Sequence, residues 1–169
     1  MIAGRGGAYA LLGLAALLAA LAVSSAWSGA SRLAGGADER AEVERSARAF
    51  VEAYGTFHVE APEDYRQRLI ALSAGDLRRA LSQARVDPVA LAERRSSQIE
   101  VLSLAVTDFS DGAASVAVTA LHTRRLLDPR TDARVEEAAR QRVELTLARE
   151  DGRWLVTGVR LLAPDPHGN

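Results

Sequence analysis

Strict alternation of apolar and more polar residues marks the last hairpin of the chain, residues 142–162. Val143, Leu145 and Leu147 alternate with Glu, Thr and Ala, which is the period of a strand with one buried face. Asp151-Gly152 follows, and glycine tolerates the positive φ that a tight hairpin turn needs. A second apolar run then follows the turn. The pattern predicts two antiparallel strands joined by a short turn.

Helical periodicity dominates the earlier part of the body. Apolar residues at spacings of three and four predict a helix over residues 38–58 with one side facing a core. Pro62 suits a first helical position and predicts the start of a second helix. Ser73 and Asp76 have the spacing of a capping box, which predicts a third short helix. One more helical turn is predicted over residues 89–93.

From Ser97 onward the period becomes that of extended chain. The pattern predicts a long strand with a bulge over residues 98–109, and a second strand over residues 113–127 after a Ser-Asp-Gly turn. With the final hairpin, the body has helices first and then about four long antiparallel strands. Helices gathered on one face of a curved antiparallel sheet are the α+β arrangement, which is the predicted fold class.

The first 37 residues differ sharply from the body. Residues 8–27 carry no charge, and as a helix they would span about 30 Å, the thickness of a bilayer core. The sequence therefore predicts a short N-terminus over residues 1–7, a transmembrane helix over 8–27 and a flexible Gly-rich tether over 28–38. The domain then covers residues 39–163, and residues 164–169 form a tail.

The charges that flank the apolar segment favour a cytoplasmic N-terminus and an extracytoplasmic domain. Arg5 lies on the near side, and acidic residues begin at Asp38. A cleaved signal peptide remains an alternative, because Ser24-Ser25-Ala26 resembles a small-residue cleavage site. A buried helix of a soluble protein is a further alternative. The first two place the domain outside the cytoplasm, and the first predicts a single-pass protein of the cell membrane.

Composition excludes several classes of site. The net charge is −1, so no overall field favours nucleic acid, and no nucleic-acid partner is predicted. The chain has no cysteine, which removes disulfides, thiolate nucleophiles and Cys-ligated zinc. All 21 basic residues are arginine, which suggests a GC-rich bacterial genome.

The order of elements and two short motifs resemble the nuclear-transport-factor-2-like (NTF2-like) superfamily, also called cystatin-like or SnoaL-like. Members often end in a strand of the form Asp-Gly-x-Trp-x-Val, and residues 151–156 read Asp-Gly-Arg-Trp-Leu-Val. Residues 49–54, Ala-Phe-Val-Glu-Ala-Tyr, match the first helix of the family more loosely. The resemblance covers Glu39 to Leu162. It implies a cone-shaped domain, whereas function varies widely within the fold.

A single membrane helix before such a domain resembles two bacterial groups. One comprises scaffold subunits of conjugation and type IV secretion machines, including TcpC-like proteins, and the other the Mce-associated membrane proteins of actinobacteria. Both resemblances imply a non-enzymatic, membrane-anchored accessory subunit that contacts other envelope proteins. The sequence leaves open which complex it joins and whether the protein is a homo-oligomer. A binder of small molecules or lipids is the alternative, followed by an isomerase or dehydratase.

Enzymes of the family that this chain resembles place a general base inside the cone, so polar and aromatic residues predicted to lie there are the candidates for catalysis. His122 shares a strand face with Val116, Val118 and Ala120, and so points toward the predicted core. The other candidates are Tyr54, His58, Tyr65 and Asp108. We find no metal-ligand spacing, phosphate loop or nucleophile triad. The sequence therefore predicts no catalytic residue, metal or cofactor, and it predicts Tyr54, His122 and Trp154 as pocket-lining residues.

Overall fold

The structure, a computed structural model, describes residues 36–85, 87–128 and 130–162. The chain divides into two units, Met1–Glu39 and Arg40–Asn169, and the fold below is that of the second unit. The predicted transmembrane helix over residues 8–27 lies outside the described residues. In the part of the chain that the structure describes, no helix combines the length and apolar character needed to cross a membrane.

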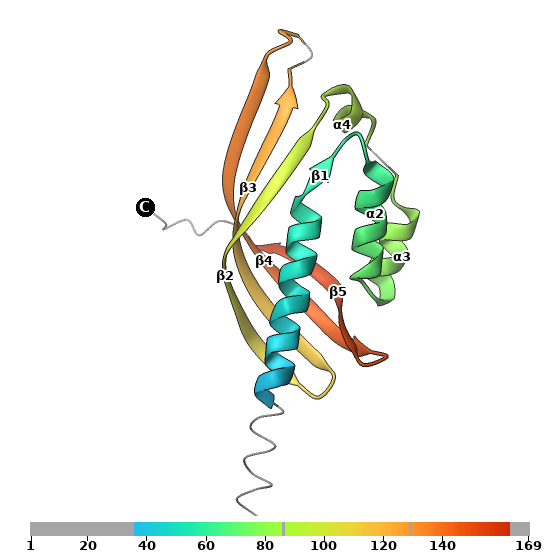
Figure 1. Ribbon diagram of the computed structural model, residues 1–169, viewed down its shortest axis with the longest axis vertical. Helices are drawn as coiled ribbons and strands as arrows, with labels where there is room; N and C mark the ends of the chain where they lie inside the picture. Colours follow the sequence, from blue (N-terminus) through green and yellow to red (C-terminus); the bar gives the residue numbers. More distant parts are fainter. Residues whose placement is uncertain (1–35, 86, 129, 163–169) are drawn as a thin grey trace, which may run out of the picture. The chain divides into compact units, whose positions relative to one another are not determined.

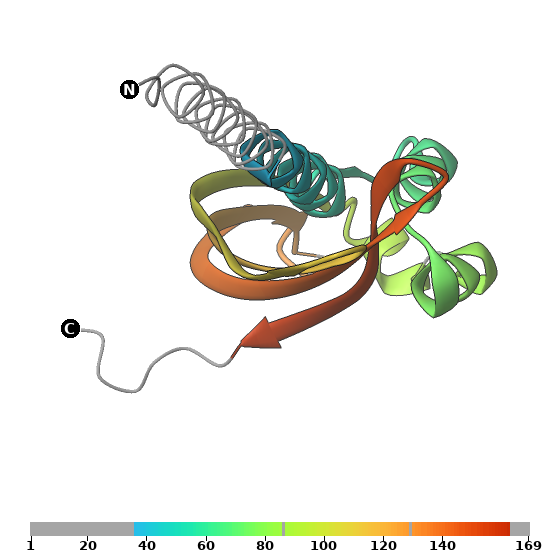
Figure 2. The same ribbon diagram turned by 90° about the horizontal axis from the view of Figure 1, so that it is seen from below.

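A curled antiparallel sheet of five strands forms the framework (Figures 1 and 2). Each strand is hydrogen-bonded to the strands next to it in sequence, so the chain adds strands in order from one edge to the other. The strands are β1 (Phe57–His58), β2 (Ser96–Ser110), β3 (Ala113–Leu127), β4 (Arg134–Glu150) and β5 (Arg153–Leu162). The α+β fold class is confirmed, although the sequence predicted about four strands.

Helices pack against one face of this sheet. A long helix covers residues 36–55, and three shorter helices follow before β2 (Figure 1). They are α2 (Pro62–Ala71), α3 (Gly75–Gln83) and α4 (Pro88–Ala92). Pro62 and Pro88 both lie in the first turn of their helices, where the missing N–H has no helical partner to lose.

The core lies between the long helix and the middle strands. In β3, Val116 and Val118 are at most 1% exposed and alternate with half-buried residues, as the sequence pattern predicts. Their register partners in β4 are Leu145 and Val143, and Leu145 is fully buried. Phe50, 1% exposed, fills this face from the long helix. The buried side chains alternate along the strands and recur about every 3.6 residues along the helix, and the two sets pack together in one core.

The predicted turns and bulge are present. The β4–β5 turn has positive φ at both central residues, 50° for Asp151 and 76° for Gly152, the conformation of a two-residue hairpin turn. β2 contains register shifts between Val101 and Ser103 and between Val106 and Asp108. Such irregularities increase local twist, which helps the sheet to curl.

The predicted end of the first helix was wrong. The helix ends at residue 55, and Phe57–His58 pairs with Ser96 and Ser97 as a short edge strand. The helix stops where Gly55 is buried against β2, and the Ser97 hydroxyl donates a 2.9 Å hydrogen bond to the Gly55 carbonyl. At its other end the helix includes residues 36–38, which were predicted to belong to the tether.

The predicted capping box at Ser73 was also wrong. The residue before α3 is Ala74, and no side chain caps the helix. The Ser73 hydroxyl is buried and donates a 2.6 Å hydrogen bond back to the carbonyl of Leu69 in α2. Residues 72–74 instead lie along β5, where Val156 accepts from the N–H of Ala74 and donates to the carbonyl of Leu72. A pairing with a distant strand overrode the local capping pattern.

Candidate functional site

Trp154 is the second residue of β5 and lies at the end of the core nearest the β4–β5 turn. Its side chain is 4% exposed. The indole packs at a tilt against Phe109 of β2, with the ring centroids 5.8 Å apart. The guanidinium of Arg40, on the long helix, lies over the Phe109 ring, 5.5 Å from its centroid. The aromatic pair therefore connects β2 with β5, and Arg40 connects the long helix to the pair.

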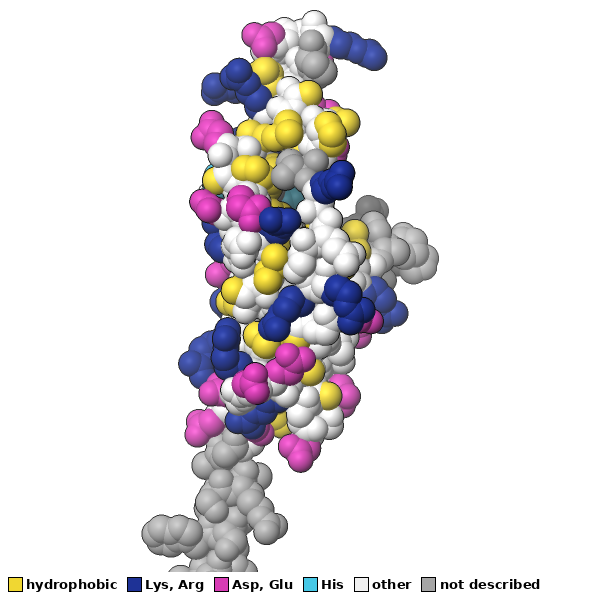
Figure 3. All heavy atoms as spheres, turned by 90° about the vertical axis from the view of Figure 1, so that its right-hand side faces the viewer, with side chains coloured by type: hydrophobic (Ala, Val, Ile, Leu, Met, Phe, Trp, Pro, Cys, Tyr) yellow, Lys and Arg dark blue, Asp and Glu magenta, His cyan; other side chains and the backbone are white. Residues whose placement is uncertain are grey.

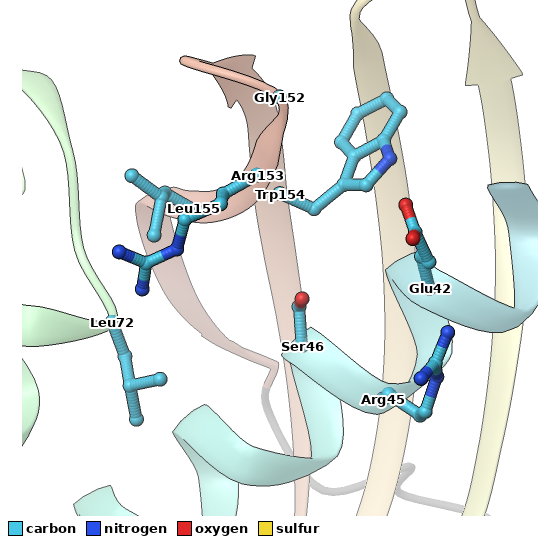
Figure 4. Close-up of a pocket in the computed structure, with 8 residues that line it drawn as sticks. All are labelled: Glu42, Arg45, Ser46, Leu72, Gly152, Arg153, Trp154 and Leu155. Carbon is cyan, nitrogen blue, oxygen red and sulfur yellow. The ribbon is translucent and has the colours of Figure 1, made fainter.

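The indole N–H of Trp154 is buried and has no hydrogen-bond partner among the described residues. A buried donor without a partner costs roughly 1–3 kcal/mol, so such a group is uncommon in a well-packed core. Figure 4 shows the nitrogen edge of the indole turned toward the carboxylate of Glu42. The donor therefore faces the hollow beside it rather than the aliphatic core.

This hollow, which we call the Trp154 hollow, has a volume of about 230 Å³. The long helix, the C-terminal end of α2 and the β4–β5 turn enclose it (Figure 4). Its lining consists of Glu42, Arg45, Ser46, Leu72, Gly152, Arg153, Trp154 and Leu155. It offers charges of both signs, a hydroxyl and an indole donor, but it contains no imidazole or thiol. These groups can bind a polar segment, and none of them forms a nucleophile–base pair.

His122 lies on the concave face of β3, opposite Ile99 of β2 and Ala139 of β4. Its Nδ1 is 3.4 Å from the side-chain nitrogen of Gln141, a long contact whose direction depends on the tautomer. Partial burial lowers the pKa of His122 below its usual value of 6.5, and the nearby Arg124 lowers it further. No carboxylate accepts from its ring among the described contacts, so the arrangement of a catalytic acid–base pair is not formed.

Tyr54 and Tyr65 lie close together, and the contact is between the side chain of Tyr65 and the backbone of Tyr54. The Tyr65 hydroxyl donates a 2.9 Å hydrogen bond to the carbonyl of Tyr54. Burial raises the pKa of Tyr65 to about 12, and repulsion from Tyr54 adds to the shift. Tyr54 itself is 44% exposed and stacks on Phe50, with the ring centroids 6.1 Å apart. This pair stabilises the contact between α2 and the long helix.

The other candidate residues are dispersed. His58 is exposed in the edge strand β1, and Asp108 is exposed next to a bulge of β2, opposite Ser115. Trp154 is level with Arg149 of β4 and His122 is level with Ala139, ten residues along the same strand. Trp154 and His122 therefore lie far apart on the sheet and do not line one common cavity. Among the described residues, no group of acidic, His or Cys side chains could hold a metal ion.

Sequence reasoning missed the helix side of the Trp154 hollow. The pattern places Glu42 and Arg45 on the solvent face of an amphipathic helix and Arg153 at a turn, and it assigns no role to Ser46. The one available signal was Ser46, a small residue among charged ones. Residues that are more than 100 positions apart in the chain meet here, so no local pattern could have revealed the contact.

A second, more apolar hollow of about 390 Å³ lies among α2, α3, α4 and β1. Figure 3 shows this side of the molecule, with acidic and basic side chains interspersed and apolar side chains in small groups. The lining residues are Phe57, Pro62, Glu63, Tyr65, Arg66, Leu69, Leu81, Ala84, Arg85, Asp87 and Ala90. The Nε of Arg66 is buried and has no hydrogen-bond partner within the described ranges, although the terminal nitrogens of Arg66 contact Glu63 and the Ser82 carbonyl.

Comparison with known proteins gives the fold but no sequence family. No protein-family model and no curated protein sequence match the chain. VirB8 of Agrobacterium tumefaciens is similar in structure, with a TM-score of 0.57 and 15% identity over 78% of this chain and 96% of VirB8. An NTF2-like protein involved in plasmid conjugation has a TM-score of 0.53 and 11% identity over 77% of this chain and 51% of that one.

The same comparison also includes a structure that carries the name of an enzyme. A scytalone dehydratase-like protein of Novosphingobium aromaticivorans has a TM-score of 0.52 and 16% identity over 79% of this chain and 91% of that one. At such low identities the likeness shows the fold alone. The chain therefore has the NTF2-like fold that its Asp-Gly-Arg-Trp motif predicted, and this fold is shared by a conjugation protein and a dehydratase-like protein.

Proposed function

We propose that this protein is a non-enzymatic, membrane-anchored extracytoplasmic interaction protein, an accessory subunit of a conjugation/type IV secretion complex or of an Mce-type envelope transport complex. The proposal combines the fold with the apolar segment over residues 8–27, which would anchor the chain and export the domain. The structural likeness of the domain to VirB8 and to a conjugation protein supports the same role.

One observation carries the non-enzymatic part of the proposal. The concave face, where an enzyme of this fold holds its base, is filled by side chains of the long helix. Phe50 and Val43 pack there against Val116 and Leu145, and all four are at most 1% exposed. His122 lies beyond this packed region, and no carboxylate of the described residues is hydrogen-bonded to it. A closed core with its polar groups at the periphery suits contact with other proteins better than catalysis.

The Trp154 hollow is the candidate contact site for such a partner. A carbonyl or carboxylate oxygen of a docked segment would satisfy the buried indole N–H, and the hydroxyl of Ser46 lies within the same lining. Satisfying a buried donor contributes to affinity and fixes the orientation of the bound segment.

The test is affinity capture of the full-length chain from detergent-solubilised envelopes of its own host. We expect other envelope proteins, including an ATPase or a permease of a transport complex, to be recovered with it. Ser46→Trp should fill the hollow and reduce this recovery severalfold. Ser103→Trp is the matched control, because Ser103 is exposed in β2, away from the hollow.

Recovery of no envelope protein by the wild-type chain would contradict the proposed function. Equal recovery by wild-type protein and by a correctly folded Ser46→Trp variant would retain the function and reject the hollow as the contact site. Circular dichroism of each variant separates a lost contact from a lost fold.

A second candidate function is the binding of a small apolar molecule or lipid in the apolar hollow. It is favoured by the volume of about 390 Å³ and by the largely aliphatic and aromatic lining. The buried Nε of Arg66 would suit a carboxylate at one end of the ligand. Mass spectrometry of an organic extract of the purified full-length protein tests this function. An extract free of any stoichiometric ligand, together with no binding of a fluorescent fatty acid, would reject it.

A further inference from the structure

The outer edge of β4 is half covered by the described strands. β5 pairs with β4 between Arg142 and Glu150, whereas β4 begins eight residues earlier, at Arg134. None of the described strands pairs with residues 134–141 on the side away from β3. On the other side, β3 pairs with these residues through Leu127 to Ala120, and β2 in turn pairs with β3 as far as Arg125. Figure 1 shows the tip of β3 and β4 extending beyond the helices. An edge of this kind is a template for an additional strand.

Hydrogen bonds at the two ends of the β3–β4 ladder show which residues of β4 bond to β3 and which point to the outer edge. Asp128 donates to the carbonyl of Ala133, and Arg149 donates to the carbonyl of Gly112. The register between these two points has no shift. Because bonded and non-bonded pairs alternate in an antiparallel ladder, the odd-numbered residues of β4 bond to β3. The N–H and C=O groups of residues 134, 136, 138 and 140 therefore point to the outer edge.

The sequence after Leu162 contains two prolines, which are poorly suited to extending β5 along this edge. Leu162 is opposite Arg142, so a continued strand would place residue 164 opposite Arg140 and residue 166 opposite Ala138. Both 164 and 166 are proline. Proline has no N–H, and these two positions are the ones that would have to donate to β4. A segment without proline at these positions suits the edge better.

The charges beside the edge indicate what that segment carries. Arg134 and Arg140 are exposed, and neither takes part in the ion pairs recorded for the described residues. Glu136, between them on the same face, is already paired with Arg125 at 2.7 Å. The edge therefore presents two available positive charges six residues apart. The first 37 residues of the chain contain no acid that could match them.

We propose that residues 134–141 of β4 bind an extended acidic segment of a partner protein, which adds a strand to the sheet. The segment pairs with the N–H and C=O groups of the even-numbered residues and places carboxylates near Arg134 and Arg140. This inference rests on the proposed interaction function and names a surface and a partner chemistry for it. The surface is separate from the Trp154 hollow.

The probe is the synthetic peptide Ac-Thr-Glu-Val-Thr-Ile-Thr-Val-Glu-Thr-NH2, whose two glutamates are six residues apart. Amide hydrogen exchange of the full-length protein is followed by NMR with and without the peptide. We expect the amides of residues 135, 137, 139 and 141 to exchange slowly in both samples. Those of residues 134, 136, 138 and 140 should exchange fast in the free protein and slow down when the peptide is bound.

Two control peptides separate the contributions. A peptide with lysine in place of both glutamates should bind more weakly, and a peptide with proline at its fourth and sixth positions should not protect the edge amides. On the protein side, Ala138→Pro removes one outward N–H, and it should weaken binding by about fivefold, the equivalent of one ordinary hydrogen bond. Arg134→Glu combined with Arg140→Glu should invert the preference between the acidic and basic peptides. Arg48→Glu, at an exposed site on the long helix, is the control for a charge reversal away from the edge, and it should leave the preference for the acidic peptide in place.

Three outcomes would overturn the inference. One is the absence of edge protection by the acidic peptide, and another is equal protection by the proline-containing peptide, a result that does not depend on how Ala138→Pro folds. The third is a concentration-dependent dimer that Ala138→Pro dissociates, since this would assign the edge to a second copy of the chain. Failure to capture envelope proteins from cells would leave the peptide result unchanged, so the two proposals fail separately.

Discussion

Gly55 and Ile99 are in such close contact that a β carbon on Gly55 would lie 2.2 Å from Cβ of Ile99. The long helix thus reaches β2 with its backbone at this point, and the absence of a side chain allows it. The neighbouring hydrogen bond from Ser97 to the Gly55 carbonyl holds the same junction. Gly55 therefore sets where the helix ends and where the edge strand β1 begins.

Gly55→Ala should destabilise the domain. The added methyl group overlaps Ile99, and overpacking of this kind costs about 1–3 kcal/mol. Urea unfolding followed by circular dichroism measures the loss. Gly55→Ala combined with Ile99→Ala should recover little of the stability, because the second change removes Cγ2 and Cδ1 of Ile99 but keeps the Cβ that lies 2.2 Å from the added carbon. An unchanged unfolding midpoint for Gly55→Ala would contradict the close contact.

Trp154→Ala should destabilise the domain by about 3–5 kcal/mol, as is usual for removal of a buried aromatic side chain. Trp154→Phe should cost much less, since it retains most of the contact with Phe109 and loses no hydrogen bond of the indole N–H. Chemical denaturation of both variants provides the comparison. A loss of less than about 1 kcal/mol for the alanine variant would place the indole at the surface.

Tyr65→Phe should remove an alkaline loss of stability. The fold raises the pKa of Tyr65 from 10.0 to about 12, so the unfolded chain ionises first. The stabilisation is complete below pH 10 and is lost as pH rises through about 12. The absence of lysine leaves tyrosines as the side chains that titrate in this window. At neutral pH the variant should lose about 1 kcal/mol with the hydrogen bond to Tyr54. Tyr54→Phe should retain most of the alkaline decline, because burial is the larger cause of the raised pKa of Tyr65 and repulsion from Tyr54 is the smaller one. A decline in Tyr65→Phe equal to that of the wild type would contradict this assignment.

His122→Gln should reduce the loss of stability at mildly acidic pH. Because the fold lowers the pKa of His122 below 6.5, the unfolded chain takes up the proton first as pH falls. Wild-type stability should therefore decrease as pH drops below 6.5, and the difference in stability between wild type and variant should become independent of pH above about 7. Thermal melts between pH 5 and pH 8 measure this effect. His58→Gln, in the exposed edge strand, is the control, and an identical pH profile for wild type and His122→Gln would show that the site is not desolvated.

Local periodicity was sufficient for most of the sheet and helices. The alternation in β3 predicted its bounds and the burial of Val116 and Val118, because a strand with one buried face needs a period of two. The Asp151-Gly152 turn and the helix start at Pro62 were predicted equally well, since positive φ and a missing N–H are properties of single residues.

By itself, then, the sequence determined the fold class, the main strands and a cysteine-free, nearly neutral chain. Tertiary structure decided the rest. Contact with Ile99 ended the long helix at Gly55, and pairing beside Val156 drew Ser73 away from its predicted cap. The Trp154 hollow joins residues 42–46 to residues 152–155, and the open edge of β4 depends on where β5 stops. These features arise from contacts between distant parts of the chain, whereas sequence patterns record the energetics of neighbouring residues.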